Sequence, residues 1–146
     1  MTIQQTGGTI GNLDIAFASI AAPVNLTATS SATGTTAIQT GAFGITNPGN
    51  YYVEIFTPLL TKGTTNLDLE LWDGGTSGTL LTTLTGHMVA STTLGQGVGI
   101  EVRVNLGAGS HNMVVTGFVD AGTGVFGAGA GTTGNQPNAF IRVRPA

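Results

Sequence analysis

The chain has 146 residues, of which 24 are Gly and 25 are Thr, and only 8% carry a full charge. Soluble domains are roughly 25% charged, and this low charge together with 40% hydrophobic residues excludes a highly charged, disordered chain. The glycines follow no strict third-position repeat and there are only 5 Pro, which excludes a collagen rod. We therefore expect a folded domain.

Charge and cysteine content exclude further classes of protein. The net charge is −3 with four basic residues, too few for the basic surface that nucleic acid requires, so we expect no nucleic-acid partner. The chain has no Cys, which removes disulfides and thiolate metal ligands. The apolar stretch at 13–24 is shorter than the ~20 residues of a membrane-spanning helix and contains Asp14, so we expect no membrane partner.

Residues 1–12 are polar and Gly-rich, and we predict an N-terminal arm there, followed by a single domain over 13–146. Within that domain, short segments with apolar residues at every second position recur between Gly, Asn, Pro and Ser clusters, and no window keeps helical spacing. This pattern is typical of an all-β protein, an antiparallel, jelly-roll-like β-sandwich. We predict about eight strands, or nine if every candidate forms, at 13–20, 24–29, 36–40, 51–57, 67–72, 79–84, 100–106, 112–119 and 139–144.

The strand at 51–57 carries large side chains on both faces. Tyr52, Glu54 and Phe56 share one face, and aliphatic residues share the other. We therefore expect core packing on the aliphatic side and a second subunit or a loop on the other. The strand at 100–106 has four aliphatic residues on one face and its charged residues on the opposite face.

The clearest hairpin joins 67–72 to 79–84 through a Gly-rich connection. Asp68 and Glu70 share the face opposite the leucines, and Trp72 follows the same parity, so we predict that Trp72 lies outward at a strand end. An outward Trp serves as a sugar platform or an interface anchor. The alternative is that its ring folds over the hairpin end and caps the core.

Residues 121–136 read AGTGVFGAGAGTTGNQ and carry almost no charge, and we predict a long loop there. Loops beyond ~12–15 residues in compact domains are usually functional or disordered, so two interpretations stay open. The loop orders against a neighbouring subunit through Val125 and Phe126, or it is a floppy surface loop. Residues 122–127 match the dinucleotide pattern G-x-G-x-x-G, but the Gly-rich sequence after them cannot continue as the helix that this motif needs.

We find no constellation that indicates catalysis. His87 and His111 are the only histidines, they lack H-x-x-x-H spacing, and we expect both to be solvated loop residues. Asp68 and Glu70 would lie ~6–7 Å apart, which suits a calcium or glycosidase pair, but outward carboxylates on an exposed strand need no role beyond solvation. We therefore predict a protein that is not an enzyme and that uses no cofactor or metal.

The chain contains, in this order, the segments YYVEIFTPL, TNLDLELWDGGTSGTLLTTL, GHMVASTTL, GIEVRVNL, LGAGSHN and MVVTGFVDA. This order resembles the small β-sandwich decoration, or cement, proteins that bind the outside of tailed-bacteriophage capsids. The resemblance covers 13–120, and the Gly-rich insertion before the last strand, FIRVR, departs from it. It implies a virion protein at the capsid surface, assembled in the host cytoplasm, that binds the major capsid protein as a homo-oligomer, usually a trimer.

Our leading hypothesis is therefore a structural virion protein that stabilises a phage head by bridging capsid subunits. The alternative is a carbohydrate-binding module or adhesin head domain, which requires a planar row of exposed aromatic rings; Trp72 is the clear candidate, with Tyr51 a further one. The residues that we expect at the capsid or subunit interface come from the arm, the hairpin and the Gly-rich loop: Thr2, Ile3, Trp72, Val125 and Phe126.

Overall fold

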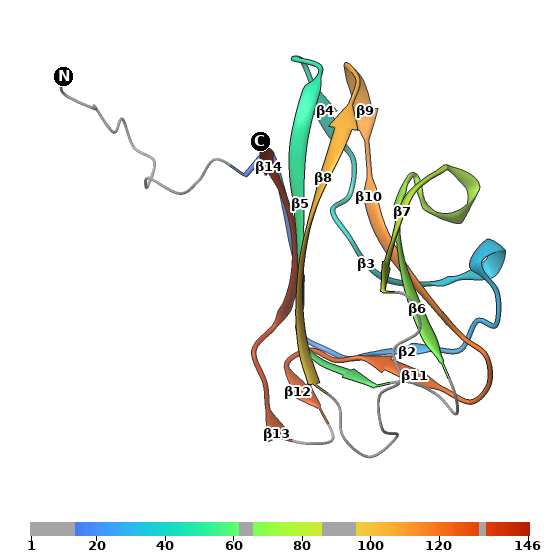
Figure 1. Cartoon of the computed structure of the whole chain (residues 1–146). Coiled ribbons are helices and arrows are strands. Elements are labelled where there is room, and N and C mark those ends of the chain that lie inside the picture. Colours follow the sequence, from blue (N-terminus) through green and yellow to red (C-terminus); the bar gives the residue numbers. More distant parts are fainter. Residues whose placement is uncertain (1–13, 62–65, 86–95, 132–133) are drawn as a thin grey trace.

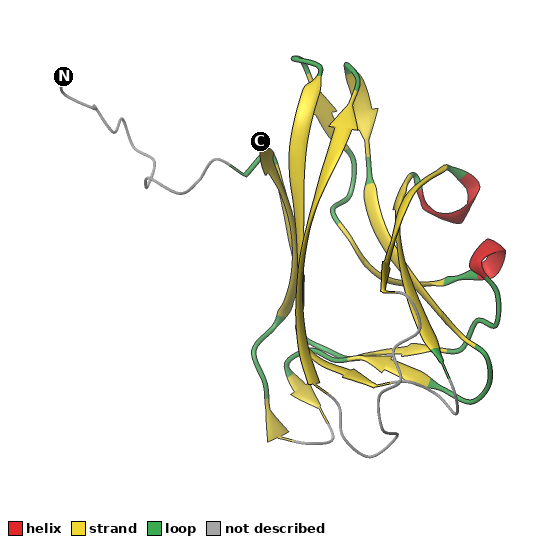
Figure 2. Cartoon of the chain, in the orientation of Figure 1, coloured by secondary structure: helices red, strands yellow, loops and turns green. Residues whose placement is uncertain are grey.

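The computed structural model describes residues 14–61, 66–85, 96–131 and 134–146. Most of their strands form two antiparallel sheets packed face to face (Figures 1 and 2), and the others form two small two-stranded sheets. The predicted fold class, an all-β, antiparallel sandwich, is confirmed. All nine predicted segments contain strands, and five further strands of two or three residues bring the described total to fourteen. The nine are β1 (Ala16–Ile20), β2 (Val24–Leu26), β3 (Thr35–Gln39), β5 (Gly49–Thr61), β6 (Leu67–Asp73), β7 (Thr79–Thr85), β8 (Gln96–Leu106), β10 (Met113–Val119) and β14 (Ala139–Pro145).

The large sheet is built around β5, which is 13 residues long and pairs with β14 on one side and β8 on the other. Its order is β1-β14-β5-β11-β2, with β8 also on β5, and the second sheet has the order β3-β10-β6-β7. Period-two burial along β5 places Val53 and Ile55 in the core, and Tyr52, Glu54 and Phe56 half-buried on the opposite side. The predicted division of this strand into two faces is therefore observed.

The core lies between the two sheets and is almost entirely aliphatic. Strands β5 and β14 supply one wall, and β6 and β10 supply the other, because their alternate side chains point inward. The largest fully buried side chains are Phe126, Leu26, Ile55, Leu60, Leu67, Leu69, Leu71, Leu106, Met113, Ile141, Val53 and Val115.

The predicted loop at 121–136 is wrong in part, since the described residues of this segment include three short strands. β11 (Gly124–Phe126) pairs with β2 and with the end of β5, and closes one end of the sandwich (Figure 1). β12 (Ala130–Gly131) and β13 (Gly134–Asn135) form a small ladder of their own. The remaining short strands, β4 (Phe43–Ile45) and β9 (Gly109–His111), pair at the opposite end.

The prediction that Trp72 is exposed is wrong, although its strand face is correct. Trp72, Glu70 and Thr116 lie on the outer side of the second sheet, yet Trp72 is only 8% exposed and Glu70 only 5%. The 3₁₀ turn η1 (Ser31–Thr33) lies against this side: the Ser31 hydroxyl donates to Glu70 Oε2 at 2.8 Å. Trp72 Nε1 donates to Thr116 Oγ1 at 3.0 Å. This outer surface is therefore covered by the chain itself. A second 3₁₀ turn is η2 (Gly75–Ser77) (Figure 2).

Candidate functional site

The outward side of β1, β14, β5 and β8, here called the outer face, carries a row of three phenylalanines. Phe17 and Phe140 have ring centroids 6.1 Å apart, and Phe140 and Phe56 have centroids 5.6 Å apart, with both pairs inclined by 27°. Phe17 is 56% exposed, and the other two are half-buried. The rings come from three adjacent strands, because Phe140 is the register partner of Phe56 and β1 pairs with β14. The outer face thus presents a continuous aromatic strip.

All three arginines of the chain lie on the same outer face. Arg142 donates from Nε at 2.9 Å and from Nη2 at 2.5 Å to Glu54 Oε2, directly across the β14–β5 pair. Its guanidinium carbon lies 5.7 Å from the centroid of the Phe140 ring, within cation–π range. The hydrogen bond with Glu54 is the main reason that the pKa of Arg142 is raised. Arg142 therefore connects the aromatic row to a fixed carboxylate.

Arg144 links three strands of the outer face. It lies on β14, its guanidinium carbon is 5.3 Å from the centroid of the Tyr52 ring on β5, and Nη2 forms an ion pair with Glu101 Oε2 on β8. A charged side chain that crosses β5 in this way ties the edge strand β8 to the centre of the sheet. Arg103, on β8, is exposed and has Tyr52 as its register partner. Within the described part of the chain, Arg103 forms no ion pair.

The structure does not bring the predicted interface residues together. Thr2 and Ile3 lie outside the described residues. Trp72 is buried, as is Tyr51, whose hydroxyl donates to the Asn47 carbonyl oxygen at 2.5 Å. Val125 is half-buried on β11, and Phe126 beside it is completely buried in the core.

Sequence reasoning missed two aromatic members of the outer face. Phe140 shares its parity with Arg142 and Arg144 in the segment FIRVR, so the alternation along that strand could have identified it. Phe17 lies in an almost wholly apolar stretch. Its neighbours do not alternate between polar and apolar residues, so the sequence does not indicate that Phe17 points outward. The shared face of Tyr52, Glu54 and Phe56 was the signal that did point here.

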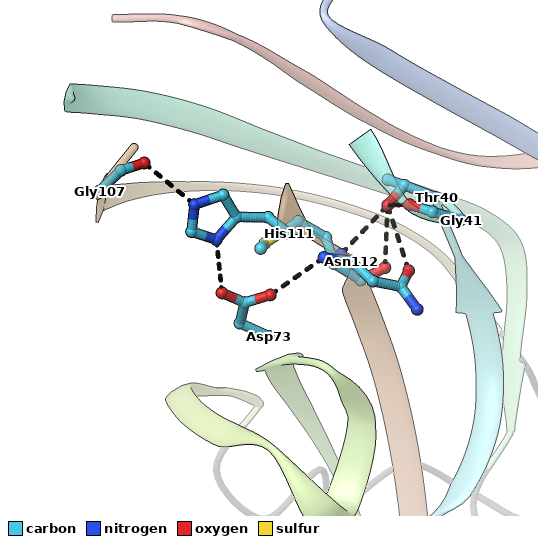
Figure 3. A network of polar contacts seen from close by, with 7 residues as sticks. Thr40, Gly41, Asp73, Gly107, His111 and Asn112 are labelled. Atoms are coloured by element: carbon cyan, nitrogen blue, oxygen red, sulfur yellow. Dashed lines mark hydrogen bonds and ion pairs between the residues drawn. The ribbon is translucent and has the colours of Figure 1, made fainter. Parts of the chain in front are cut away.

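A second polar cluster lies at the end of the sandwich near β9 (Figure 3). His111 Nδ1 is 2.6 Å from Asp73 Oδ2, and His111 Nε2 is 3.0 Å from the Gly107 carbonyl oxygen. Asp73 Oδ1 also accepts a hydrogen bond from the backbone N–H of Asn112 at 3.0 Å. The expectation of a solvated histidine is wrong for His111, because its side chain is only 13% exposed. His87 lies outside the described residues.

Both ring nitrogens of His111 therefore face acceptors within the fold, and only the protonated imidazole can donate to both. The hydrogen bond to Asp73 is the main cause that raises the pKa of His111 above 6.5, while burial acts in the opposite direction. The Gly107 carbonyl occupies the position at which a Ser or Thr hydroxyl lies in a catalytic triad. The geometry suits a clasp that joins β6, β9 and the β8–β9 turn.

We expect this clasp to make stability depend on pH. A histidine whose pKa is raised by folding stabilises the folded state fully below its unfolded pKa of about 6.5 and loses that contribution as the pH rises through the folded value. The difference in unfolding free energy between wild type and His111→Gln should therefore shrink from pH 5.5 to pH 9, measured by urea denaturation. Asp73→Asn should remove the same dependence. If the difference in unfolding free energy stays constant over this pH range, the protonated His111 does not stabilise the fold through Asp73.

Two further findings concern the described residues only. No group of three or more His, Cys, Asp or Glu side chains among them is arranged to hold a metal ion. Their helical segments are single turns, and none is long and apolar enough to span a bilayer.

Comparison with known proteins gives similarity of fold alone. No family model and no curated protein matches the sequence. Among solved structures, the carbohydrate-binding module CBM6cm-2 of Cellvibrio mixtus lichenase 5A, in complex with cellotriose, is 16% identical with a TM-score of 0.49, over 91% of this chain and 98% of that one. The globular domain of zebrafish complement 1qA is 18% identical with a TM-score of 0.45, over 90% and 96%. The VP2 subviral particle of infectious bursal disease virus is 12% identical with a TM-score of 0.43, over 88% and 36%.

Proposed function

We propose that the chain is a structural virion protein that decorates the outside of a tailed-phage head and stabilises it by bridging major capsid subunits. In this proposal the protein is assembled in the host cytoplasm and acts at the capsid surface as a homo-oligomer, a trimer. Its partner is the major capsid protein, and the function needs no catalysis, cofactor or metal.

The observation that carries this proposal is the composition of the outer face. Aromatic residues and Arg are the residue types enriched at the centres of protein interfaces, and here they gather on one side of one sheet. Arg142 and Arg144 are already paired with Glu54 and Glu101, so a protein that covers these residues does not leave their charges unpaired. On a capsid lattice, many such contacts of modest strength gain through avidity.

One observation favours the alternative, a carbohydrate-binding module or adhesin head. The outer face carries a row of aromatic rings, of which Phe17 is exposed and the other two are half-buried, although neither Trp72 nor Tyr51 belongs to it. Sugar rings bind by stacking on an open aromatic face. Phe140 is half-buried between Phe17 and Phe56 and has the Arg142 guanidinium 5.7 Å from its centroid, so less of its ring is open to a sugar than in an isolated exposed ring. The arrangement suits a broad protein contact better than a glycan.

The test is binding to purified heads that lack their decoration protein. We expect wild type to bind saturably and to raise the temperature at which the heads break open. Phe17→Ala should weaken binding by about ten-fold, which corresponds to roughly 1.4 kcal/mol of contact at the aromatic row. Leu80→Ala is the matched control, because Leu80 is 43% exposed on β7 of the opposite sheet and its loss should leave binding unchanged.

Failure of the wild-type protein to bind heads at saturating concentration would overturn the proposal. Binding of wild type, Phe17→Ala and Leu80→Ala to a glycan array tests the alternative, a carbohydrate-binding function. If wild type and Leu80→Ala bind a glycan while Phe17→Ala does not, and the heads remain unbound, the carbohydrate-binding function replaces the one proposed.

A further inference from the structure

The outer face has one basic side chain for which the fold supplies no acidic partner. Glu54 and Glu101 are bound by Arg142 and Arg144, which leaves Arg103 exposed and without an ion pair within the described part of the chain. The register places Tyr52 between Arg144 and Arg103 on neighbouring strands. This end of the outer face is therefore locally positive, on a chain whose net charge is −3.

A partner that covers Arg103 has to supply a carboxylate. Burying an unpaired guanidinium is costly, and a planar guanidinium matches a carboxylate through two parallel hydrogen bonds. On β8, Arg103 is four residues from Gly99, which is the register partner of Phe56. At ~3.3 Å per residue, the aromatic row and Arg103 are about 13 Å apart, a distance that fits a protein surface with an apolar patch and a separate acidic residue.

A second copy of this chain is a poor source of that carboxylate. Outside the outer face, Glu70 is buried and bound by Ser31, and Asp73 holds His111. Asp120 accepts a hydrogen bond from Asn66 at 2.7 Å, and Asp68 also interacts within the fold. Asp14 lies close enough to Arg142 for its charge to raise the pKa of that guanidinium. Pairing any of these carboxylates with Arg103 of another copy would break or share an existing interaction, so charge complementarity favours a different protein.

We infer that Arg103 is the residue through which the outer face selects its partner: it pairs with an acidic side chain of the capsid protein, while the phenylalanine row covers an apolar patch about 13 Å away. This inference rests on the proposed function and deepens it by naming the chemistry of the partner. Arg103 sets specificity, because a capsid surface without the carboxylate would leave it buried and unpaired.

The test uses the full chain and undecorated heads over a range of salt concentrations. Arg103→Gln should weaken binding by about ten-fold or more and flatten its salt dependence, and Arg103→Lys should recover part of the affinity. The matched control is Ser77→Glu, which lowers the net charge by the same one unit at an exposed position on η2, beside the opposite sheet. It should bind within about two-fold of wild type.

The outcomes separate this inference from the proposed function. If wild type binds heads and Arg103→Gln binds equally well with the same salt dependence, the inference is wrong and the decoration function stands. If Arg103→Gln instead abolishes self-association in sedimentation while binding to heads is unchanged, a second copy occupies the outer face and the inference is also overturned. If wild type does not bind heads, the proposed function fails and the inference with it.

Discussion

Phe126→Ala should lower the free energy of unfolding by about 3–5 kcal/mol, the usual cost of removing a buried aromatic ring. Phe126 is completely buried, with Val24 and Leu60 as its register partners on β2 and β5. Truncation therefore leaves a cavity where these strands meet the core. Val125→Ala is the matched control, because Val125 is the adjacent residue on the half-buried side of β11, and it should cost less than about 1.5 kcal/mol.

Urea denaturation of the two variants and the wild type measures these differences. The experiment also decides between two roles for this pair of residues. If the Phe126→Ala protein unfolds at the same urea concentration as wild type but dissociates from its oligomer, Phe126 acts at a subunit interface, as the sequence analysis predicted. A large loss of stability would place Phe126 in the core of the single chain.

The strands of the sandwich could be predicted because apolar and polar residues alternate along a strand that has one buried and one exposed face. In β5 and β8, aliphatic residues alternate with polar or aromatic ones, and this period-two pattern identifies a strand with two different faces. β11 has no such signal, since it contains only Val125 and Phe126 between Gly124 and Gly127. It forms because β2 and β5, about 100 and 65 residues earlier in the chain, offer free edges to it. Pairing between distant segments is not a local property of the sequence.

The exposure of the candidate site likewise depends on segments that are distant in the sequence. Parity placed Trp72 on the outer side of its strand, and that was correct. Whether an outer side is wet depends on what lies over it, and here the cover includes η1, some 40 residues earlier in the chain. On the large sheet no described element lies over the corresponding side, and Phe17 at its edge is 56% exposed. Direction was predictable from sequence, and exposure was not.

The structure shows where the few charged residues of this chain lie. Of the ten charged side chains that the structure describes, five lie on the outer face, and four of those are paired with one another. The rest of the described surface is mostly Thr, Gly, Ala and Asn. Charge is therefore concentrated where aromatic rings are also concentrated, which is the combination that a specific protein contact uses.

Gly129→Ala should destabilise the protein by about 2–5 kcal/mol, because two separate costs coincide at this residue. Its φ of +59° is a conformation that side-chain-bearing residues rarely adopt, and a Cβ there would lie 2.0 Å from the carbonyl oxygen of Ala21. The backbone cannot simply move away, since the Gly129 N–H donates to the Pro137 carbonyl oxygen and the Gly129 carbonyl oxygen accepts from the Gln136 N–H, at 3.1 Å each.

Gly41→Ala separates the two costs, because Gly41 has a φ of +74° but no atom within 4 Å of its would-be Cβ. Gly41→Ala should therefore lower the free energy of unfolding only by the conformational cost, about 1–2 kcal/mol. Urea denaturation measures the loss for both variants, and the difference between the two losses is the cost of the close approach to Ala21. Equal losses for the two variants would show that the chain around Ala21 yields freely. A larger loss at Gly129 would show that a segment with almost no side-chain signal is held by close backbone packing, which only glycine permits.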